Sequence, residues 1–517
     1  MSLFLLVLFL LAAGAGAWFA ERLGPQGPRW AALLALALAL AFVLGVAAAL
    51  PPADGLLATD PADPASWLLH WRATWIPRFG IALEFALDGV SLILLVLTLL
   101  LGLVAVVSGW QEIDVRPGLF HASLLWTLAG VVGVFTALDL VLFFLFWEVM
   151  LVPMYLLIAI WGHEDRAAAA MKFFIFTQAS GLLLLFAVVV LAWQAAGTGP
   201  LSFSYFDLLA APLDLRLGFW LMLGFFAAFV VKLPGFPLHS WLPDAHTQAP
   251  TAGSVLLAGI LLKTGAYGLL RFCLPLFPEA SRAFAPVAML LGVAGILYGA
   301  VLAFGQRDVK RLVAYSSVSH MGFVLLGLYT FNALGLQGAV MQMVTHGVST
   351  AALFMLAGTL QHRLHTRDMA QMGGLWTQAP RMGGCALFFA LASLGLPGLG
   401  NFVAEFLVFF GVFAVAPWLA VAAGLGMVGA AVYALWLVQR IFHGEPAPDL
   451  ALADFDRREL AAMYVMMAAL LWLGLYPQPV LDLAQPVIDG LVPWLDGLPA
   501  TSTIAASTAM TSTAVTP

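Results

Sequence analysis

Four charged side chains lie in stretches of the sequence that are otherwise apolar. Glu148 lies in LFFLFWEVMLVP and Glu405 in GNFVAEFLVF, while Lys232 and Lys263 follow FFAAFVV and LLAGILL. Ionised groups are costly near the centre of a bilayer, so by default they indicate an ion or proton path. A buried lysine can release its proton, whereas an arginine stays charged. These residues therefore predict proton transfer inside a membrane.

Three histidines, His239, His320 and His346, lie in similar surroundings. Histidine exchanges protons near neutral pH, which suits a relay between buried charges. A lone intramembrane histidine can equally be structural. Four buried ions together favour a role in proton transfer, because a helical bundle can be stabilised at a lower free-energy cost without buried charges. Asp88 and Asp139 lie nearer to the ends of apolar segments, where we expect helix capping or contact with interfacial water.

Two of the apolar segments are interrupted beside these charges. LPGFPLHSWLP follows Lys232, and LPGLGN precedes Glu405. Proline cannot continue a regular helix, and breaks at membrane depth are tolerated where the backbone faces protein or a water-filled cavity. The two interrupted segments are five spans apart, which predicts two five-helix repeats. An odd number of spans makes such repeats inverted, a pattern typical of secondary transporters.

The elements that position these groups are apolar helices. Of 517 residues, 63% are hydrophobic and 9% are charged, whereas a soluble domain carries about 25% charged residues. About 20 apolar residues cross a bilayer as a helix. Fourteen such segments are present: Leu3–Ala20, Trp30–Leu50, Gly89–Ser108, Leu119–Ala137, Leu140–Trp161, Phe173–Trp193, Leu217–Leu238, Ala252–Phe272, Phe284–Phe304, Leu312–Tyr329, Leu336–Leu360, Met382–Phe413, Trp418–Leu437 and Leu460–Tyr476. We predict an all-α polytopic membrane protein of about fourteen helices, in which helices 7 and 12 are broken.

The distribution of basic residues supports this number of spans. Most Lys and Arg residues outside the spans fall in one set of alternate loops; the other set has only Arg72, Arg78, Arg216, Arg271 and Arg282. By the positive-inside rule, both termini lie outside. The loop from Pro51 to Gly80 reads as irregular. The expected divisions are 1–117 (N-terminal helices), 118–275 (first repeat), 283–440 (second repeat), 455–499 (helix 14 and C-terminal segment) and 500–517 (disordered tail).

Several other functions are excluded by composition and motif. A net charge of −6 without a basic domain argues against nucleic-acid binding. Cys273 and Cys385, in separate apolar segments, form neither a disulfide framework nor an iron–sulfur ligand set. Residues 424–429 fit GxGxxG but lie inside an apolar span without a preceding strand, so close helix packing explains them better. We expect no metal and no cofactor in this chain.

Longer motifs resemble a known family. FFLFWEVMLVPMYLLI, KFFIFTQASG, KLPGFPLHSWLPDAHTQAPTAGSVLLAGILLKTGAYGLLRF and DVKRLVAYSSVSHMGFVLLG resemble the antiporter-like membrane subunits of respiratory NADH–quinone oxidoreductase, complex I, over about residues 70 to 480. Subunits of cation/proton antiporters and membrane-bound hydrogenases share the block PLHSWLPDAHTQAPT. Glu405 replaces the lysine usual in subunits L and N. Together with WIPRFGI and HTRDM, it makes the chain similar to the chain-4-like branch.

The resemblance implies a role for each buried group. Glu148 matches the fifth-helix glutamate that pairs with the lysine of the broken seventh helix, here Lys232. Lys263 matches the central lysine of the eighth helix, and Glu405 the terminal site. The histidines of the linking polar axis are His239, His320 and His346. The resemblance also implies a bacterial inner membrane, lipid contacts and subunits L and N as neighbours. NADH, FMN, iron–sulfur clusters and quinone would be bound by partner subunits.

The predicted mechanism is a proton half-channel from the inside to Lys232 and Lys263, with an exit to the outside near Glu405 and with Glu148 as a switch. Three alternatives remain. A Na⁺/H⁺ exchanger shares almost every motif, although Glu405 argues against it, and neighbouring genes for flavin and iron–sulfur subunits would decide. For a purely structural subunit, neutralising Lys263 would change assembly but not turnover. A separate quinone-binding enzyme lacks a readable quinone site.

Overall fold

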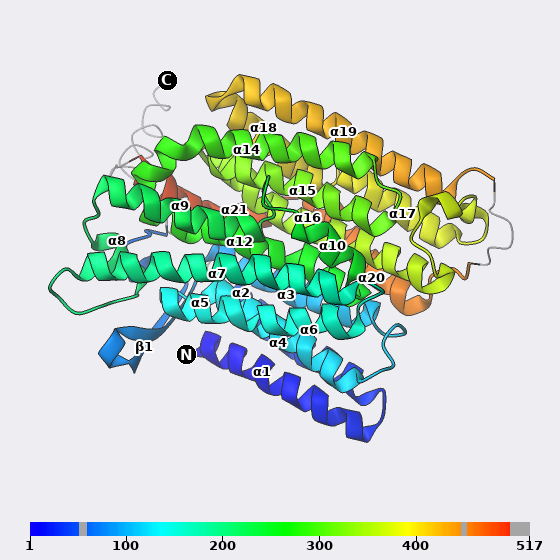
Figure 1. The fold of residues 1–517 in the computed structure, drawn as a ribbon, viewed down its shortest axis with the longest axis horizontal. Helices are drawn as coiled ribbons and strands as arrows, with labels where there is room; N and C mark the ends of the chain where they lie inside the picture. The colour runs from blue at the N-terminus through cyan, green and yellow to red at the C-terminus, as the bar shows by residue number, and fades with distance from the viewer. Residues whose placement is uncertain (51–58, 446–451, 497–517) are drawn as a thin grey trace, which may run out of the picture.

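The structure is a computed structural model that describes residues 1–50, 59–445 and 452–496. Its helices run side by side along the long axis of a bundle (Figure 1). Thirteen of the described helices are long and apolar enough to span a membrane. They correspond to all the predicted segments except Met382–Phe413, which consists of two shorter helices separated by a break. The prediction of a helical membrane bundle is confirmed.

The described helices of the bundle follow in chain order: α1 (Ser2–Ala20), α2 (Gly27–Ala48), α3 (Gly89–Ser108), α4 (Pro117–Thr136), α5 (Leu140–Val149), α6 (Leu151–Trp161), α7 (Arg166–Ala196), α8 (Tyr205–Ala210), α9 (Leu215–Lys232), α10 (Trp241–Gln248), α11 (Thr251–Leu256), α12 (Leu262–Gly268), α13 (Leu274–Leu276), α14 (Pro278–Phe304), α15 (Val309–Leu328), α16 (Ala333–Leu364), α17 (Pro380–Ser393), α18 (Gly400–Val415), α19 (Pro417–Phe442), α20 (Arg457–Leu475) and α21 (Gln478–Leu495).

Both predicted helix breaks are present. α9 ends at Lys232, and the chain then turns before α10, with the Trp241 indole donating to the carbonyl of Val231 at 2.9 Å. The second break separates α17 from α18, where Gly395 and Gly398 adopt φ values of +78° and +94°. Glycine fits these two positions because other residues are strained there. Each break lies next to a buried charge.

The eighth span, Thr251–Leu276, is irregular in a way that the sequence did not predict. α11, α12 and α13 are joined by two π-helical turns, Leu257–Leu261 and Leu269–Cys273. π-Helical turns are rare and often occur at functional sites. Lys263 lies in α12, between the two turns.

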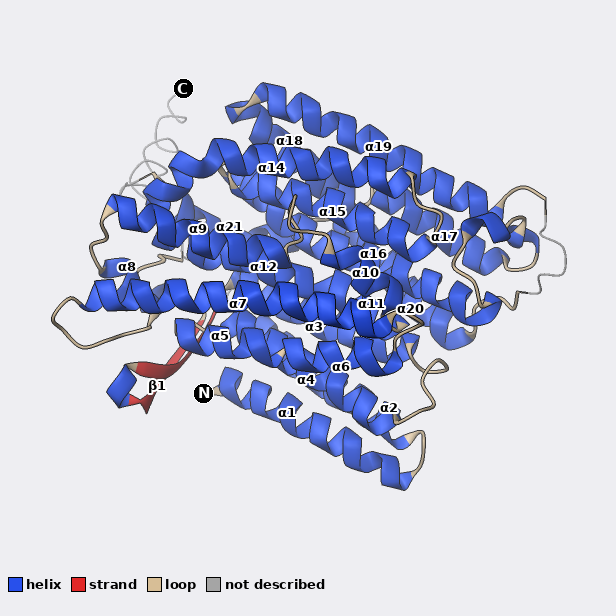
Figure 2. Ribbon diagram, viewed as in Figure 1, coloured by secondary structure: helices blue, strands red, loops and turns tan. Residues whose placement is uncertain are grey.

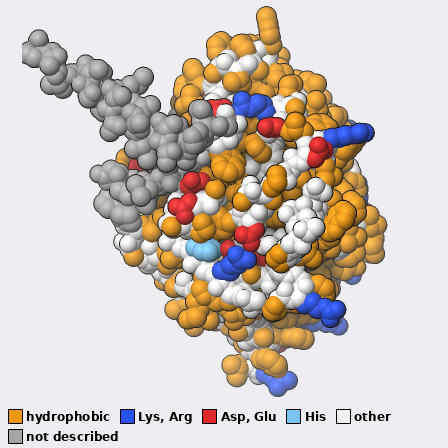
Figure 3. All heavy atoms as spheres, turned by 90° about the vertical axis from the view of Figure 1, so that its left-hand side faces the viewer, with side chains coloured by type: hydrophobic (Ala, Val, Ile, Leu, Met, Phe, Trp, Pro, Cys, Tyr) orange, Lys and Arg blue, Asp and Glu red, His pale blue; other side chains and the backbone are white. Residues whose placement is uncertain are grey.

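Ion pairs and hydrogen bonds join the loops at each end of the bundle. At one end, Arg29 donates to the carbonyl of Ile113 at 2.7 Å, and Arg363 pairs with Glu459 at 2.5 Å. At the other end, Arg282 pairs with Asp496 at 2.8 Å. In a view onto this second end, the charged side chains are scattered among apolar ones (Figure 3).

The irregular loop predicted at Pro51–Gly80 is wrong in part, because it contains a strand. β1 (Leu69–Ile76) pairs antiparallel with β2 (Ile81–Leu87), and this hairpin lies at one end of the bundle (Figure 2). Alternate side chains of β1 are exposed and half-buried, the pattern of a strand with one covered face. Residues 51–58 of the same loop, and the tail predicted to be disordered at 500–517, lie outside the described residues.

Asp88 and Asp139 cap helices, as expected, but neither faces water. Asp88 accepts a hydrogen bond from the Ser91 amide at 2.8 Å and forms an ion pair with Arg271. Asp139 accepts from the Leu142 amide at 3.0 Å and from the Ala82 amide of β2 at 2.9 Å, which ties the hairpin to α5. Burial, to which the nearby Glu84 charge adds, raises the pKa of Asp139 to about 6 despite its backbone donors.

Candidate functional site

Lys263 and His346 form the centre of the site. The Nζ of Lys263 lies 2.7 Å from Nδ1 of His346 on α16, and it donates to the carbonyl of Ala258 at 2.5 Å. That carbonyl belongs to the π-helical turn Leu257–Leu261, so the turn helps to orient the lysine. Both side chains are fully buried. Either member of the Lys263–His346 contact can be the donor, depending on where the proton resides.

A second histidine extends this contact toward α18. The rings of His346 and His320 lie 5.5 Å apart between centroids. Nδ1 of His320 lies 3.0 Å from Oε1 of Glu405, and Gln342 donates to the same oxygen at 3.2 Å. The other oxygen of Glu405 is buried and has no hydrogen-bond partner in the part of the chain that the structure describes. Lys263, His346, His320 and Glu405 thus form one continuous row of titratable groups.

The break in the twelfth span shapes the Glu405 end of this row. Ser393, the last residue of α17, lies 3.1 Å from Nε2 of His320, and the Tyr433 hydroxyl lies 3.2 Å from the same atom. A Cβ on Gly395 would lie 3.0 Å from Oε2 of Glu405. The turn between the two helices therefore leaves space for the carboxylate.

Glu148 and Lys232 form a second, separate cluster. Among the described residues, the Nζ of Lys232 has no hydrogen-bond partner; it lies 4.9 Å from the ring centroid of Trp147 and 6.0 Å from that of Phe173. Glu148 is close enough for an electrostatic interaction with Lys232, but one carboxylate oxygen is buried and has no hydrogen-bond partner within the described ranges. Glu148 also lines an apolar groove of about 700 Å³. The predicted pair is therefore present in a separated state.

His239 lies apart from both clusters. Its ring contacts Phe236, Tyr298 and Tyr315, with centroid distances of 6.0, 5.2 and 6.4 Å. None of the described interactions joins His239 to the four predicted charged residues. The structure thus brings four of the seven predicted residues into one row and two into a second cluster.

His246 is a buried histidine that the sequence analysis did not select. It lies on α10, is fully buried and stacks on Phe354 at 4.2 Å, and neither ring nitrogen has a partner among the described residues. Lys263 and Lys310 are both close enough to act electrostatically on its ring. One feature of the sequence did indicate His246: it follows the same proline-rich break that Lys232, a predicted site residue, precedes.

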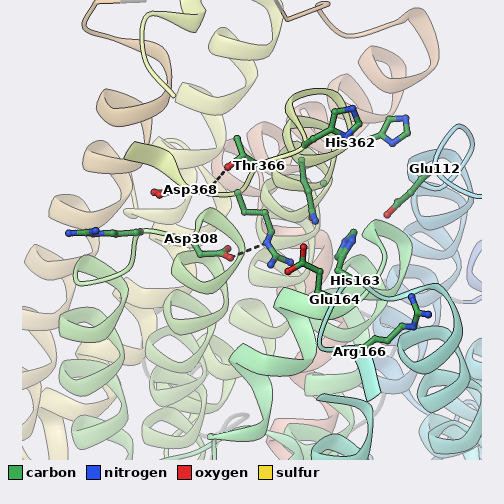
Figure 4. A pocket seen from close by; sticks show the side chains of 13 residues that line it. Glu112, His163, Glu164, Arg166, Asp308, His362, Thr366 and Asp368 are labelled. Carbon is green, nitrogen blue, oxygen red and sulfur yellow. Dashed lines mark hydrogen bonds and ion pairs between the residues drawn. The ribbon is translucent and has the colours of Figure 1, made fainter. Parts of the chain in front are cut away.

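Lys310 was also missed, because it stands in a charged stretch at the start of a helix. Its Nζ donates to the carbonyl of Ala249 at 3.0 Å and lies 3.4 Å from Nε2 of His163. His163 in turn lines a cavity of about 800 Å³, with the acidic and basic side chains of several loops around it (Figure 4). We call this cavity the inner vestibule, because the distribution of basic residues predicts that its loops lie inside. Within it, Arg367 pairs with Asp308 at 3.1 Å.

Within the described part of the chain, no group of three or more His, Cys, Asp or Glu side chains is arranged to hold a metal ion. The chemistry that the site offers is proton exchange between neighbouring lysine, histidine and glutamate side chains. Histidine is suited to both accept and donate a proton near neutral pH, and in the row it lies between a lysine and a carboxylate.

Known proteins share both sequence and fold with this chain. The family model described as NADH:quinone oxidoreductase/Mrp antiporter, TM, matches residues 137–430, more than half of the chain. NADH-quinone oxidoreductase subunit M of Pseudomonas aeruginosa is 53% identical over 486 residues, covering 93% of this chain and 95% of that protein. The same subunit of Escherichia coli K12 is 52% identical over 486 residues, covering 92% and 95%.

Solved structures agree with these relatives. A chain of respiratory complex I from Thermus thermophilus with bound NADH superposes with a TM-score of 0.85 at 31% identity, covering 96% of this chain and all of that chain. A chain of the Mrp complex from Dietzia sp. DQ12-45-1b, with 22% identity, has a TM-score of 0.80 over 94% of this chain and 97% of its own, which shows a common fold.

Proposed function

Because the chain belongs to the family of subunit M of bacterial NADH-quinone oxidoreductase, complex I, we propose that its buried Lys, His and Glu side chains carry protons across the membrane in a defined order. As a member of this family, it is an antiporter-like subunit of the membrane arm and a multi-span protein of the bacterial inner membrane. The observation that carries the proposal is the row of contacts from Lys263 through His346 and His320 to Glu405.

A proton leaves the Nζ of Lys263 for Nδ1 of His346 across a contact of 2.7 Å. Nε2 of His346 is buried without a partner, so it can release a proton toward His320 when a water or a ring rotation bridges the 5.5 Å between the rings. Nδ1 of His320 then passes the proton to Glu405 at 3.0 Å. Glu405 is the terminal group, with its exit toward the outside.

Uptake takes place from the inner vestibule. His163 opens onto this cavity and contacts Lys310, which lies close to His246. His246 has two free ring nitrogens and lies within electrostatic reach of Lys263. We place the proton path through these groups, from His163 and Lys310 to His246 and then to Lys263. His239, against two tyrosines, would contribute a separate branch.

Glu148 and Lys232 act as the switch for this path. A carboxylate close to Lys232 holds the ammonium group in its charged form, and separation of the pair allows the buried lysine to release its proton. The titrations of these groups are coupled, so a change in the protonation of one group changes the proton affinity of the others. Moving one charge across the membrane costs about 2.3 kcal/mol per 100 mV, so each transfer must be coupled to the energy of quinone reduction.

We propose that this redox chemistry belongs to partner chains, which would hold NADH, FMN, iron–sulfur clusters and quinone, and that this chain contributes proton translocation alone. The antiporter-like subunits L and N would be its neighbours, and both termini would lie outside. Residues 118–275 and 283–440 would form the two inverted repeats. Each contains one of the observed breaks, between α9 and α10 or between α17 and α18.

The test is to interrupt the row within the assembled complex. Lys263→Met and His346→Gln should each lower coupled NADH–quinone turnover and proton pumping, counted per assembled complex in membrane vesicles, by about tenfold or more. The matched control is His121→Gln, which changes a buried histidine of α4 whose one hydrogen bond to the described residues is with the Pro117 carbonyl. Reduced assembly with unchanged turnover per complex would favour a purely structural subunit instead.

A further inference from the structure

A glycine on α7 leaves the space that the carboxylate of Glu148 occupies. A Cβ built on Gly181 would lie 2.3 Å from Oε1 of Glu148, whereas the next nearest atoms, Cδ of Glu148 and Cδ1 of Trp147, lie at 3.5 Å. Only the end of the glutamate side chain is therefore in the way. Gly181 is buried in the middle of a regular helix, where its backbone does not require glycine. The absence of a side chain at Gly181 leaves room for the carboxylate of Glu148.

A second residue of α7 contacts the same carboxylate. Gln178 lies three positions before Gly181, on the same face of the helix, and its side-chain amide is close enough to Glu148 for a polar interaction with the carboxylate. We call the space beside Gly181, with the amide of Gln178, the α7 notch. Oε1 of Glu148, which lies against Gly181, has no hydrogen-bond partner among the residues that the structure describes. The notch thus holds the carboxylate by shape on one side and by a polar contact on the other.

Lys232 is accommodated without its carboxylate partner. Its ammonium group lies 4.9 Å from the ring centroid of Trp147 and 6.0 Å from that of Phe173, and it makes no hydrogen bond to the described residues. Cation–π contacts of this kind can stabilise a desolvated ammonium group. The structure therefore shows both members of the switch at places where they do not touch each other.

We propose that Gly181 is a positioning residue of the switch, and that the α7 notch is the resting place of the Glu148 carboxylate while it is separated from Lys232. The inference rests on the proposed function, in which Lys232 releases its proton when the carboxylate withdraws. Without the notch, the carboxylate has no place on α7 and remains near Lys232, which stays charged. Gly181 sets how readily the pair separates.

The experiment compares four variants in the complete complex: Gly181→Ala, Glu148→Asp, the double variant with both changes, and Gly45→Ala. Alanine is a better helix former than glycine, so α7 itself tolerates the first change. The matched control is Gly45→Ala in α2, where a Cβ meets no atom within 4 Å. Assembled complex is counted on native gels, and coupled turnover and proton pumping are measured per complex.

We expect Gly181→Ala to lower turnover per complex on the order of tenfold, with the control unchanged. Aspartate is one methylene shorter than glutamate, so its carboxylate withdraws from the added methyl group. The double variant should therefore turn over faster than Gly181→Ala alone. A general packing defect would not be relieved by shortening Glu148.

Two outcomes overturn the inference. The first is full turnover in Gly181→Ala, and the second is loss of turnover that Glu148→Asp does not relieve. Failure of the proposed function is recognised separately with Glu148→Gln. If that variant keeps full coupled turnover, Glu148 is not a switch at all; if it loses turnover while Gly181→Ala does not, only the notch is wrong.

Discussion

At the scale of the residue, the side chains around the inner vestibule determine whether His163 is charged. Burial, together with the positive charges of Lys310, Arg367 and Arg166, lowers its pKa from 6.5 to about 3. The ring is therefore neutral at physiological pH, and its Nε2 can accept a hydrogen bond from Lys310 at 3.4 Å. A neutral ring at this position adds no further positive charge beside Lys310.

The lowered pKa of His163 predicts a pH-dependent stability. Between pH 6.5 and about 3 the unfolded chain binds a proton at this site that the folded chain does not, so its contribution is complete above pH 6.5 and is lost as the pH falls. His163→Gln should reduce the fall in the thermal midpoint of the solubilised complex between pH 7 and pH 4.5. His362→Gln, at an exposed histidine of the same vestibule, is the control. Parallel pH profiles for His163→Gln and the unmodified complex would contradict the prediction.

The buried charges could be predicted from the sequence because a charge inside an apolar run is rare and costly. Lys263 and Glu405 were found in this way, and they belong to one row of contacts. The different surroundings of His246 and His239 could not be predicted. They depend on how the chain turns after Lys232 and on which neighbouring helix each ring meets, and both are set by packing between distant segments.

At the scale of the element, α14 and α15 approach each other through glycine. A Cβ on Gly322 would lie 2.6 Å from the carbonyl oxygen of Gly292, 2.8 Å from Cγ1 of Ile296 and 2.9 Å from the backbone nitrogen of Ile296. Two of these three atoms belong to the backbone, which cannot yield as a side chain can. His320 lies two residues before Gly322 on α15, so this helix contact also fixes the position of the histidine that we propose as a relay.

Gly322→Ala should therefore force α14 and α15 apart. We expect a destabilisation of about 1–3 kcal/mol, seen as a lower thermal midpoint and less assembled complex in the membrane. Gly384→Ala in α17 provides the comparison, because a Cβ there meets no atom within 4 Å. Equal stability of the two variants would show that the helices adjust without cost.

The long apolar helices were predictable because each must bury its backbone in a run of about 20 apolar residues. α21 and the β-hairpin were not. α21 contains Pro486 and Pro493, which argue against a helix in the sequence alone. It is placed by contacts with distant segments, such as the hydrogen bond from the Thr59 amide to the Pro486 carbonyl at 2.8 Å.

At the scale of the whole molecule, the loops at each end of the bundle contact one another. The two ends therefore form two distinct surfaces. Trp71 of the hairpin stacks on Phe4 near the N-terminus, at 5.7 Å, so residue 4 and the hairpin share one end of the bundle, which we propose to be the outer end. Asp496, the last described residue, pairs with Arg282 at that same end. The inner vestibule lies at the other end.

This arrangement predicts which positions an impermeant thiol reagent reaches. Both native cysteines are buried, so an introduced cysteine is labelled selectively. Arg216→Cys, at an exposed outer position, should be labelled in intact spheroplasts, and Glu164→Cys, at the vestibule, only in inverted vesicles. The reverse labelling pattern would require the whole bundle to be inverted in the membrane.

The eighth span carries one further consequence. All of Thr251–Leu276 is buried among other parts of the same chain, whereas only about a third of α1 and α2 is covered. Lys263, the proposed central proton carrier, is therefore shielded from acyl chains by the protein itself. Bilayer thickness and lipid type act on the peripheral helices, whereas the dielectric environment of Lys263 is determined by the residues of this chain that surround it.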